Sequence, residues 1–212
     1  MRILHSISGL DFRLGGPVRA VLDLSASIAA LGHEVRVVSP ADPDAPEAWK
    51  REGSNPRSIA LGRPGVGGTR YTGEALERLR DEIRGTDVVH IHGVWTPFMT
   101  QVARESHRAG KPYVISSRGT LDDWCMQQRR LKKLLYLKAA GGSWMLNHAS
   151  AVHCTAEGEL RQSKKWFPRS KGVVIPNLLN LKPYESMPGP EAAREKFPFF
   201  DTGEPVLLFL SR

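Results

Sequence analysis

Short apolar runs alternate with helical segments along most of this chain, and that alternation constrains its fold more than any other feature. The segment Asp87-Val-Val-His-Ile-His92 is typical of a strand buried in a parallel sheet. A strand at Ile3–Ile7, a helix that ends near Leu31 and a strand at Val35–Ser39 form a βαβ opening. Further strands are predicted at residues 58–61, 113–117, 151–154 and 172–175. The pattern predicts an α/β fold with an open, doubly wound, mostly parallel sheet, whose ligands lie outside the carboxyl ends of the strands.

The end of the chain suggests a second domain. Residues 206–212 have an apolar strand pattern, although a strand of this kind normally leads into a further βα unit. A proline-containing segment with one short helix precedes them. We therefore expect a first domain at residues 1–180, a linker at 181–204, and at 205–212 the first strand of a second domain that is otherwise missing. A long helical region is expected near residues 129–147.

Composition and charge narrow the function classes. The 212 residues carry a formal net charge of +8, with most of the excess in the second half of the chain. Charge alone leaves nucleic acid, an anionic membrane surface and phosphorylated ligands open as partners. Two cysteines are too few for a disulfide framework, and no long apolar run or signal peptide is present in the sequence. We expect a cytoplasmic protein without a structural metal.

The first candidate site is Gly15-Gly16-Pro17, at the predicted start of the first helix. Glycines allow a backbone to approach a ligand closely, and the free N–H groups of a helix start attract phosphate. A simple tight turn is the alternative interpretation. Because the loop lacks the GxGxxG spacing of a dinucleotide site, an NAD enzyme is disfavoured.

His90 and His92 form the second candidate. We expect their side chains to point to opposite faces of the strand, which makes them a poor metal pair. His92 lies nearer the carboxyl end of the strand and is the better candidate for a hydrogen bond to a ligand. His90 is expected to pack under a helix.

The third candidate follows the strand that ends at Ser117. There Arg118 can bind phosphate or carboxylate with two parallel hydrogen bonds, although a surface salt bridge is the alternative. Asp122 and Asp123 are interpreted as helix caps rather than as acid/base groups. No GxSxG or GxxxxGK[ST] motif occurs, which disfavours hydrolases and P-loop NTPases.

Five segments taken together resemble the amino-terminal half of family-four retaining glycosyltransferases: Gly15-Gly16-Pro17-Val-Arg19, Leu31-Gly32-His33-Glu-Val35, Asp87-Val-Val-His-Ile-His92, Ser117-Arg-Gly-Thr120 and Val174-Ile-Pro-Asn177. The resemblance covers essentially the whole chain. It implies a GT-B architecture, in which two Rossmann-like domains face a cleft. The first domain binds mainly the acceptor, and the second binds mainly the nucleotide-sugar donor.

The resemblance also implies roles for individual residues. Gly15 and Gly16 would approach the donor diphosphate or the transferred sugar, and Arg212 would contact the donor phosphates. Arg118 stands where many members carry a histidine near the transferred sugar, so it is the candidate catalytic residue. Neither a metal nor another cofactor is implied. The candidates for the acceptor side are His92, Trp95, Arg118, Gly119, Trp124, Arg129 and Lys138.

The expected reaction is transfer of a hexosyl unit from a nucleoside-diphosphate sugar to a hydroxyl of a glycan or lipid-linked acceptor, with retained configuration. Polysaccharide or lipopolysaccharide synthesis fits such an acceptor. The basic helices suggest docking to the anionic inner face of a membrane, and nucleic acid is not an expected partner. The 212 residues alone should not catalyse transfer. Two alternatives remain, a GT-B nucleotide-sugar epimerase and a non-catalytic module that binds anionic glycans.

Overall fold

The computed structural model describes residues 1–65, 70–178, 181, 185–200 and 207. Its centre is one seven-stranded sheet with the order β3-β2-β1-β4-β5-β6-β7, in which every neighbouring pair of strands is parallel. The strands are β1 (Arg2–Ile7), β2 (Glu34–Ser39), β3 (Arg57–Ala60), β4 (Val88–His92), β5 (Tyr113–Ser116), β6 (Ala151–Cys154) and β7 (Lys171–Val174). The predicted α/β fold with a doubly wound parallel sheet is therefore confirmed.

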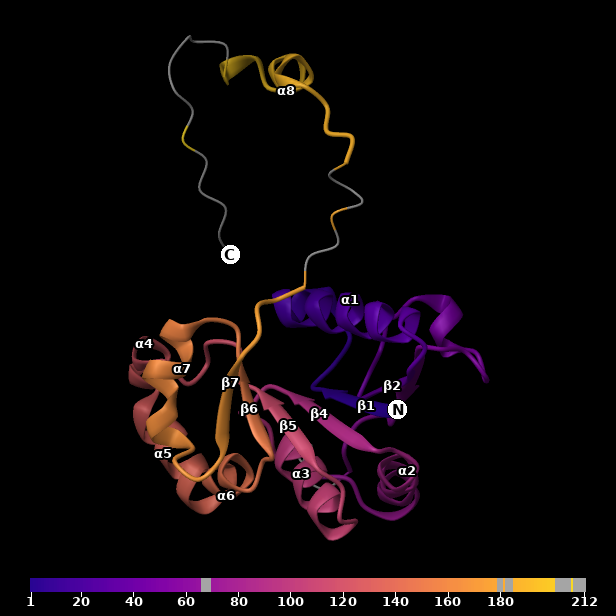
Figure 1. Cartoon of the computed structure of the whole chain (residues 1–212), viewed down its shortest axis with the longest axis vertical. Coiled ribbons are helices and arrows are strands. Elements are labelled where there is room, and N and C mark those ends of the chain that lie inside the picture. The colour runs from indigo at the N-terminus through magenta and orange to yellow at the C-terminus, as the bar shows by residue number, and fades with distance from the viewer. Residues whose placement is uncertain (66–69, 179–180, 182–184, 201–206, 208–212) are drawn as a thin grey trace. The chain divides into compact units, whose positions relative to one another are not determined.

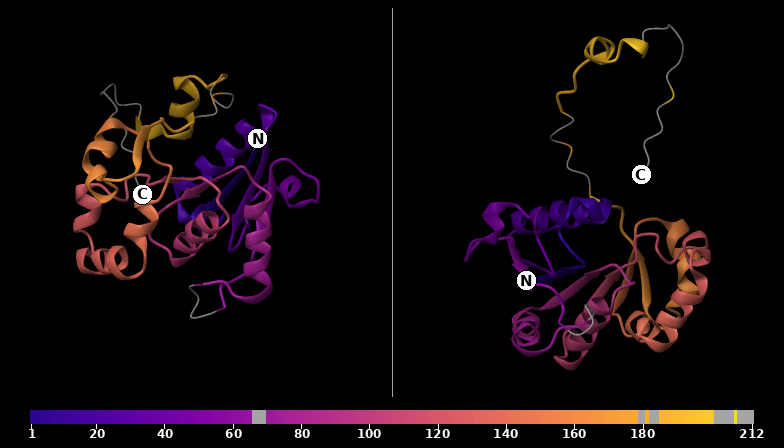
Figure 2. Two further views of the ribbon diagram at one scale, coloured as in Figure 1. Left: turned by 60° about the horizontal axis from the view of Figure 1, so that its bottom comes forward. Right: turned by 180° about the vertical axis from the view of Figure 1, so that it is seen from behind.

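The helices lie on both faces of the sheet, and Figures 1 and 2 show α1 on the opposite face from α2 and α3. The α-helices are α1 (Gly16–Ala30), α2 (Gly73–Arg84), α3 (Pro97–Arg108), α4 (Asp123–Gln127), α5 (Arg130–Ala139), α6 (Gly142–Asn147), α7 (Glu157–Ser163) and α8 (Pro190–Lys196). Short 3-10 helices are η1 (Phe12–Leu14), η2 (Glu47–Lys50), η3 (Lys164–Trp166) and η5 (Pro198–Phe200).

Each face of the sheet has its own apolar core. The smaller core joins Ile7 and Val37 of the sheet to Val18, Val21 and Leu22 of α1. The larger core lies on the other face, where the strands contact α2, α3, α5 and α6. This division follows from strand geometry, because alternate side chains of a strand point to opposite faces.

The predicted long helix near residues 129–147 is wrong. Arg129 has a left-handed backbone with φ of 52°, and Gly141 has φ of 89°. An α-helix requires negative φ at each position, so the chain breaks at these two residues. Residues 129–147 form α5 and α6 in place of one helix, and Arg129 separates α5 from the preceding α4.

The chain divides into two compact units, Met1–Leu178 and Leu179–Arg212. The proposed nature of the second unit, a linker followed by the first strand of another domain, stays a prediction. The predicted strand at 205–212 and Arg212 lie outside the described residues, with the exception of Leu207. Among the described helices, none is both long enough and apolar enough to cross a membrane.

Candidate functional site

A pocket of about 110 Å³ lies where the order of the strands reverses. The chain leaves β1 toward β2 on one side, whereas β4 and β5 continue to the other side. In doubly wound sheets such a reversal opens a crevice at the carboxyl ends of the strands. The pocket is lined by residues that follow β1, β4 and β5, including Ser8, Gly9, Leu14, Pro17, Val18, His92, Gly93, Ser117, Arg118 and Thr120.

The start of α1 contributes one wall of this pocket. Gly15 has φ of 101°, a conformation that favours glycine, and no side chain caps the N–H groups of the first turn. A Cβ atom at Gly16 would meet no other atom within 4 Å, so the space beside this residue is open. The first turn carries no acidic side chain that would neutralise the positive end of the helix.

Arg118 contributes the charge of the pocket. Its Nη1 donates to Oδ1 of Asn177 at 3.0 Å and its Nη2 donates to Nδ1 of His92 at 3.2 Å. Its buried Nε has no hydrogen-bond partner in the described part of the chain. Burial lowers the pKa of Arg118, and the charge of Glu159 opposes this shift. Among the described residues, no carboxylate forms an ion pair with Arg118. The described part of the chain therefore gives no support to the interpretation of Arg118 as part of a surface salt bridge.

His92 connects Arg118 to His5 through hydrogen bonds that fix both tautomers. A guanidinium only donates, so Nδ1 of His92 accepts and its Nε2 carries the proton. This Nε2 lies 2.9 Å from Nδ1 of His5, which must accept in turn. His5 then carries its proton on Nε2, a buried atom that has no hydrogen-bond partner among the described residues. Burial, aided by the charge of Arg118, lowers the pKa of His5 to about 4, and burial holds the pKa of His92 well below its ordinary value.

A second hydrogen-bond chain crosses the same face of the sheet. Nε2 of His90 and Nδ1 of His153 each lie 2.7 Å from Oγ of Ser116. Nε2 of His153 lies 2.7 Å from the carbonyl oxygen of Ile175, which can only accept. In neutral rings this direction makes Ser116 donate to His153 and accept from His90. Burial holds the pKa of His90 well below its ordinary value.

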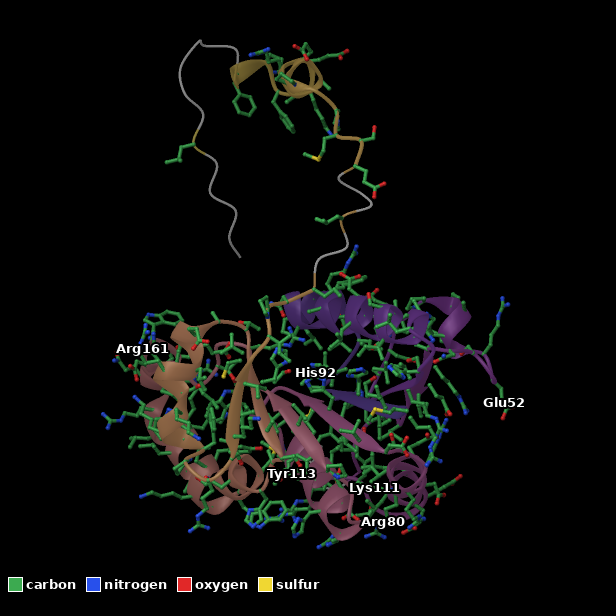
Figure 3. All side chains as sticks on the ribbon, viewed as in Figure 1. Glu52, Arg80, His92, Lys111, Tyr113 and Arg161 are labelled. Atoms are coloured by element: carbon green, nitrogen blue, oxygen red, sulfur yellow. The ribbon has the colours of Figure 1, made fainter. Side chains whose placement is uncertain are left out.

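The prediction that His90 and His92 point to opposite faces is wrong. Residues two apart along a strand share a face, and the two rings lie 4.1 Å apart between centroids. Figure 3 shows His92 in the interior of the domain. His90 is hydrogen-bonded to Ser116, and its expected packing under a helix stays a prediction.

One ligand atom from each of His5, His90 and His92 can be chosen so that all three lie within 4.8 Å of one another, close enough to hold a metal ion. The geometric reason for rejecting a metal pair therefore fails, while the absence of a metal stays a prediction. Two of the nitrogens are already joined to each other in the His5–His92 hydrogen bond, and Arg118 adds a positive charge beside them. Both features oppose a second cation here.

Glu159 is a site residue that sequence reasoning missed. Its carboxylate accepts hydrogen bonds from the backbone N–H groups of Gly119 and Thr155, each at 2.6 Å, and from the hydroxyls of Ser117 at 2.7 Å and Thr155 at 2.9 Å. Burial alone would raise the pKa of Glu159, but these hydrogen bonds outweigh it and lower the pKa. Glu159 thereby fixes the loop that carries Arg118.

The remaining predicted residues divide into two groups. Gly119 lies in the loop that Glu159 fixes, and Trp95 packs against Tyr136 and lies under the ammonium group of Lys133. Trp124, Arg129 and Lys138 are exposed on or beside α4 and α5 and do not line the pocket. The structure thus brings His92 and Arg118 together beside the start of α1, while the acceptor roles of all these residues stay predictions.

Comparisons with known proteins agree with this architecture. A family model for the glycosyl transferase 4-like domain matches residues 15–178, which is well over half of the chain. No curated protein sequence gives a significant match.

Solved structures with the same fold include two proteins of low sequence identity. Sucrose-phosphate synthase from Thermosynechococcus elongatus is 17% identical with a TM-score of 0.59, and the match covers 93% of this chain and 53% of that chain. HepE from Anabaena, solved in complex with UDP and glucose, is 16% identical with a TM-score of 0.64, and the match covers 93% and 50%. The chain thus spans about half the length of these proteins. Its sheet order, the crevice beside α1 and the family match show that it belongs to the glycosyl transferase 4-like domain family and has the Rossmann-like fold of a GT-B glycosyltransferase domain.

Proposed function

We propose that this domain takes part in the transfer of a hexosyl unit from a nucleoside-diphosphate sugar to a hydroxyl of a glycan or lipid-linked acceptor. The observation that carries the proposal is the guanidinium of Arg118, which is partly buried beside the start of α1 and has no carboxylate partner among the residues that the structure describes. An unpaired cation of this kind is costly unless an anion binds to it. A diphosphate supplies that anion.

The reaction breaks the bond between the anomeric carbon and the diphosphate oxygen and forms a bond from the acceptor oxygen to the same carbon. Negative charge grows on the departing diphosphate, which takes up the proton of the acceptor hydroxyl. Arg118 and the free N–H groups of α1 stabilise this charge. In this single step the configuration is retained when the acceptor approaches from the face that the diphosphate leaves. Arg212 and a second domain would supply most of the donor contacts. Without that domain, the 212 residues should be inactive.

His92 and His5 act here as positioning residues for Arg118. They are neutral at pH 7, so they hold the guanidinium without adding charge to the pocket. Gly15 and Gly16 leave room for the diphosphate or the transferred sugar. No metal or other cofactor is proposed.

A lipid-linked acceptor fits the surface of α5, where Leu131 and Leu135 are 84% and 66% exposed on a helix that also carries Arg130, Lys132 and Lys138. A basic helix with apolar side chains binds anionic membrane surfaces. We therefore propose a cytoplasmic protein that associates peripherally with a membrane, as expected for polysaccharide or lipopolysaccharide synthesis. Nucleic acid is not proposed as a partner.

Calorimetric titration tests the proposal. UDP and UDP-glucose are titrated into the 212-residue chain and into the protein expressed from the complete gene, each with and without Arg118→Gln. We expect tight binding only by the longer protein, and a loss of about tenfold or more with Arg118→Gln, because a hydrogen bond to a charged group contributes about 1.5 to 3 kcal/mol. Arg161→Gln, on the outer surface of α7, is the control with the same charge change.

The outcomes separate the alternatives. Conversion of the free nucleotide sugar without an acceptor would support the epimerase. Glycan binding by the 212-residue chain, without nucleotide binding or turnover by the longer protein, would support the non-catalytic module. Equal affinities for Arg118→Gln and Arg161→Gln would remove Arg118 from the site.

A further inference from the structure

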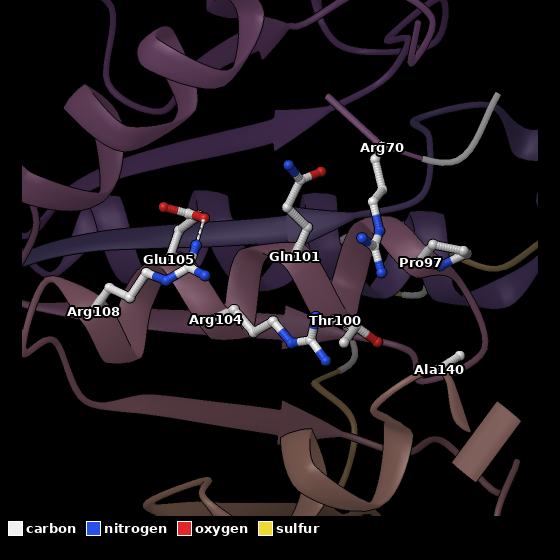
Figure 4. A pocket seen from close by; sticks show the side chains of 8 residues that line it. All are labelled: Arg70, Pro97, Thr100, Gln101, Arg104, Glu105, Arg108 and Ala140. Atoms are coloured by element: carbon white, nitrogen blue, oxygen red, sulfur yellow. Dashed lines mark hydrogen bonds and ion pairs between the residues drawn. The ribbon is translucent and has the colours of Figure 1, made fainter. Parts of the chain in front are cut away.

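A second hollow, here called the α3 groove, shares no lining residue with the pocket beside Arg118. It has a volume of about 430 Å³ and runs along the outer face of α3. Arg70 reaches it from the segment before α2, and Ala140 borders it at the end of α5. Figure 4 shows the guanidinium groups of Arg70 and Arg104 both pointing toward Thr100.

The α3 groove carries more positive than negative charge. Its lining contains three arginines, Arg70, Arg104 and Arg108, and one acid, Glu105. The two carboxylate oxygens of Glu105 are already occupied, Oε1 by Arg108 at 2.5 Å and Oε2 by Arg80 at 2.8 Å. Within the described part of the chain, neither Arg70 nor Arg104 has an ion pair.

The backbone next to Arg70 is held in place by Gln101. The side-chain Oε1 of Gln101 accepts from the backbone N–H of Tyr71 at 2.9 Å, and its Nε2 donates to the backbone carbonyl of Tyr71 at 2.9 Å. The phenol of Tyr71 is buried and donates to the carbonyl oxygen of Gly62 at 2.6 Å. The backbone from which the side chain of Arg70 extends is therefore held in place.

Arg104 is held by an aromatic ring in place of a carboxylate. Its Cζ lies 5.9 Å from the centre of the Trp144 ring, which is in turn stacked on His148. Gly141 makes room for the guanidinium, since a Cβ atom there would lie 2.6 Å from Nη2 of Arg104. Stacking of this kind orients a guanidinium while its N–H donors stay available to a ligand.

We propose that the α3 groove binds a sugar that carries an oxyanion. The oxyanion is a phosphate or a carboxylate, and it binds between Arg70 and Arg104. Arginine matches the geometry of these groups, and the volume lies in the range of small-molecule sites. The anion site stands on its own geometry. The identity of its ligand as part of the acceptor glycan rests on the proposed function, because a connection of only four residues joins the carboxyl end of β4 to α3, whose first residue, Pro97, lines the groove.

The test uses the indole N–H of Trp144 as a reporter in nuclear magnetic resonance titrations of the 212-residue chain, with the signal assigned through Trp144→Phe. The probes are glucose 6-phosphate, glucuronate, glucose and inorganic phosphate. We expect saturable shifts with glucose 6-phosphate and with glucuronate, weaker binding of inorganic phosphate, and no shift with glucose. Arg104→Gln and Arg70→Gln should each weaken binding about tenfold or more, since each removes a charged hydrogen-bond donor.

Two control variants show whether an effect is specific to the α3 groove. Arg161→Gln makes the same charge change on α7 and should leave the affinity for both anionic sugars unchanged. Arg118→Gln should also leave it unchanged, so failure of the transferase proposal and failure of this one are separate results. Arg70 is exposed, so Arg70→Gln serves if Arg104→Gln does not fold. No shift with either anionic sugar, an equal shift with glucose, or equal loss with Arg161→Gln would overturn the proposal.

Discussion

Glu105 and Glu159 are both buried carboxylates, but their surroundings differ. Glu105 lies between two arginines, so its charge is balanced by ion pairs. Glu159 accepts four hydrogen bonds from neutral donors, and Arg118 nearby is held by neutral acceptors. Ion pairs thus balance the charge of Glu105, whereas neutral donors surround Glu159 and the neighbouring Arg118 has no ion pair among the described residues. The difference lies in how each buried acid is stabilised, by charged partners at Glu105 and by neutral hydrogen-bond donors at Glu159.

The largest expected effect tests the neutral donors around Glu159. Glu159→Ala leaves two backbone N–H groups and two hydroxyls without their acceptor, and we expect the free energy of unfolding to fall by about 3 kcal/mol. Urea unfolding measures the change. Glu157→Ala removes an exposed acid from the same helical turn and should change it by less than about 0.5 kcal/mol. Similar values for the two variants would show that Glu159 does not fix the loop.

Acid should lower the stability of the domain through the buried histidines near Arg118. The folded-state pKa of His5 is about 4, below its unfolded value of 6.5, so the unfolded chain takes up a proton first as the pH falls. Stability should therefore be constant above about pH 6.5 and fall toward pH 4, by about 1.4 kcal/mol per pH unit for this group. Urea unfolding from pH 7.5 to 4.5 measures the slope. His5→Gln should reduce the slope by the contribution of this group, while His90 and His92, whose pKa values are also lowered, keep the rest. An unchanged slope would place the acid sensitivity elsewhere.

The next prediction compares how substitutions of Glu105 and of Arg118 change the free energy of unfolding. Glu105→Gln breaks two ion pairs in the α3 region and should lower the free energy of unfolding by about 1 to 2 kcal/mol. Arg118→Gln removes a partly buried cation whose desolvation is uncompensated, and it should change stability by less than about 1 kcal/mol while it weakens nucleotide binding. Thermal unfolding of both variants decides the point. A larger loss of stability with Arg118→Gln would mean that this arginine stabilises the fold.

The smallest effect concerns how Arg118 is positioned. His92→Asn keeps an acceptor near the place of Nδ1, whereas His92→Leu removes it. With the protein from the complete gene, we expect UDP affinity to fall by about tenfold with His92→Leu and by about threefold or less with His92→Asn. Equal losses would indicate that His92 acts only through packing.

Local sequence patterns were sufficient to predict the sheet but not the whole site. Buried parallel strands are short, apolar and separated by helices, so their number and order of appearance could be recognised. The face shared by His90 and His92 also follows from the two-residue period of a strand, so the prediction of opposite faces contradicts the sequence pattern itself. The interruption of the predicted helical region at Gly141 also had a local signal, the pair Gly141-Gly142, because glycine readily adopts the left-handed backbone that ends a helix.

Long-range contacts account for the rest. The hydrogen bond from Gly119 to Glu159 joins residues 40 positions apart, and nothing near Glu159 distinguishes it from Glu157 in sequence. The α3 groove depends in the same way on Gln101 meeting Tyr71, 30 positions away. Arg118 was recognised because it directly follows a predicted strand, whereas its missing carboxylate partner became visible only in the folded domain.

The pairing of β1 has a consequence for how the chain folds. Residues 2–7 form hydrogen bonds with β2 on one side and with β4 on the other, where Ile3 lies opposite Val88. During synthesis this strand leaves the ribosome first among the seven, yet it must wait for β4 before both its edges are covered. Until then it exposes an unpaired strand edge, which favours aggregation and chaperone binding. Destabilising changes in β4 should therefore lower the yield of folded protein in cells more than their effect on the stability of the finished domain would suggest.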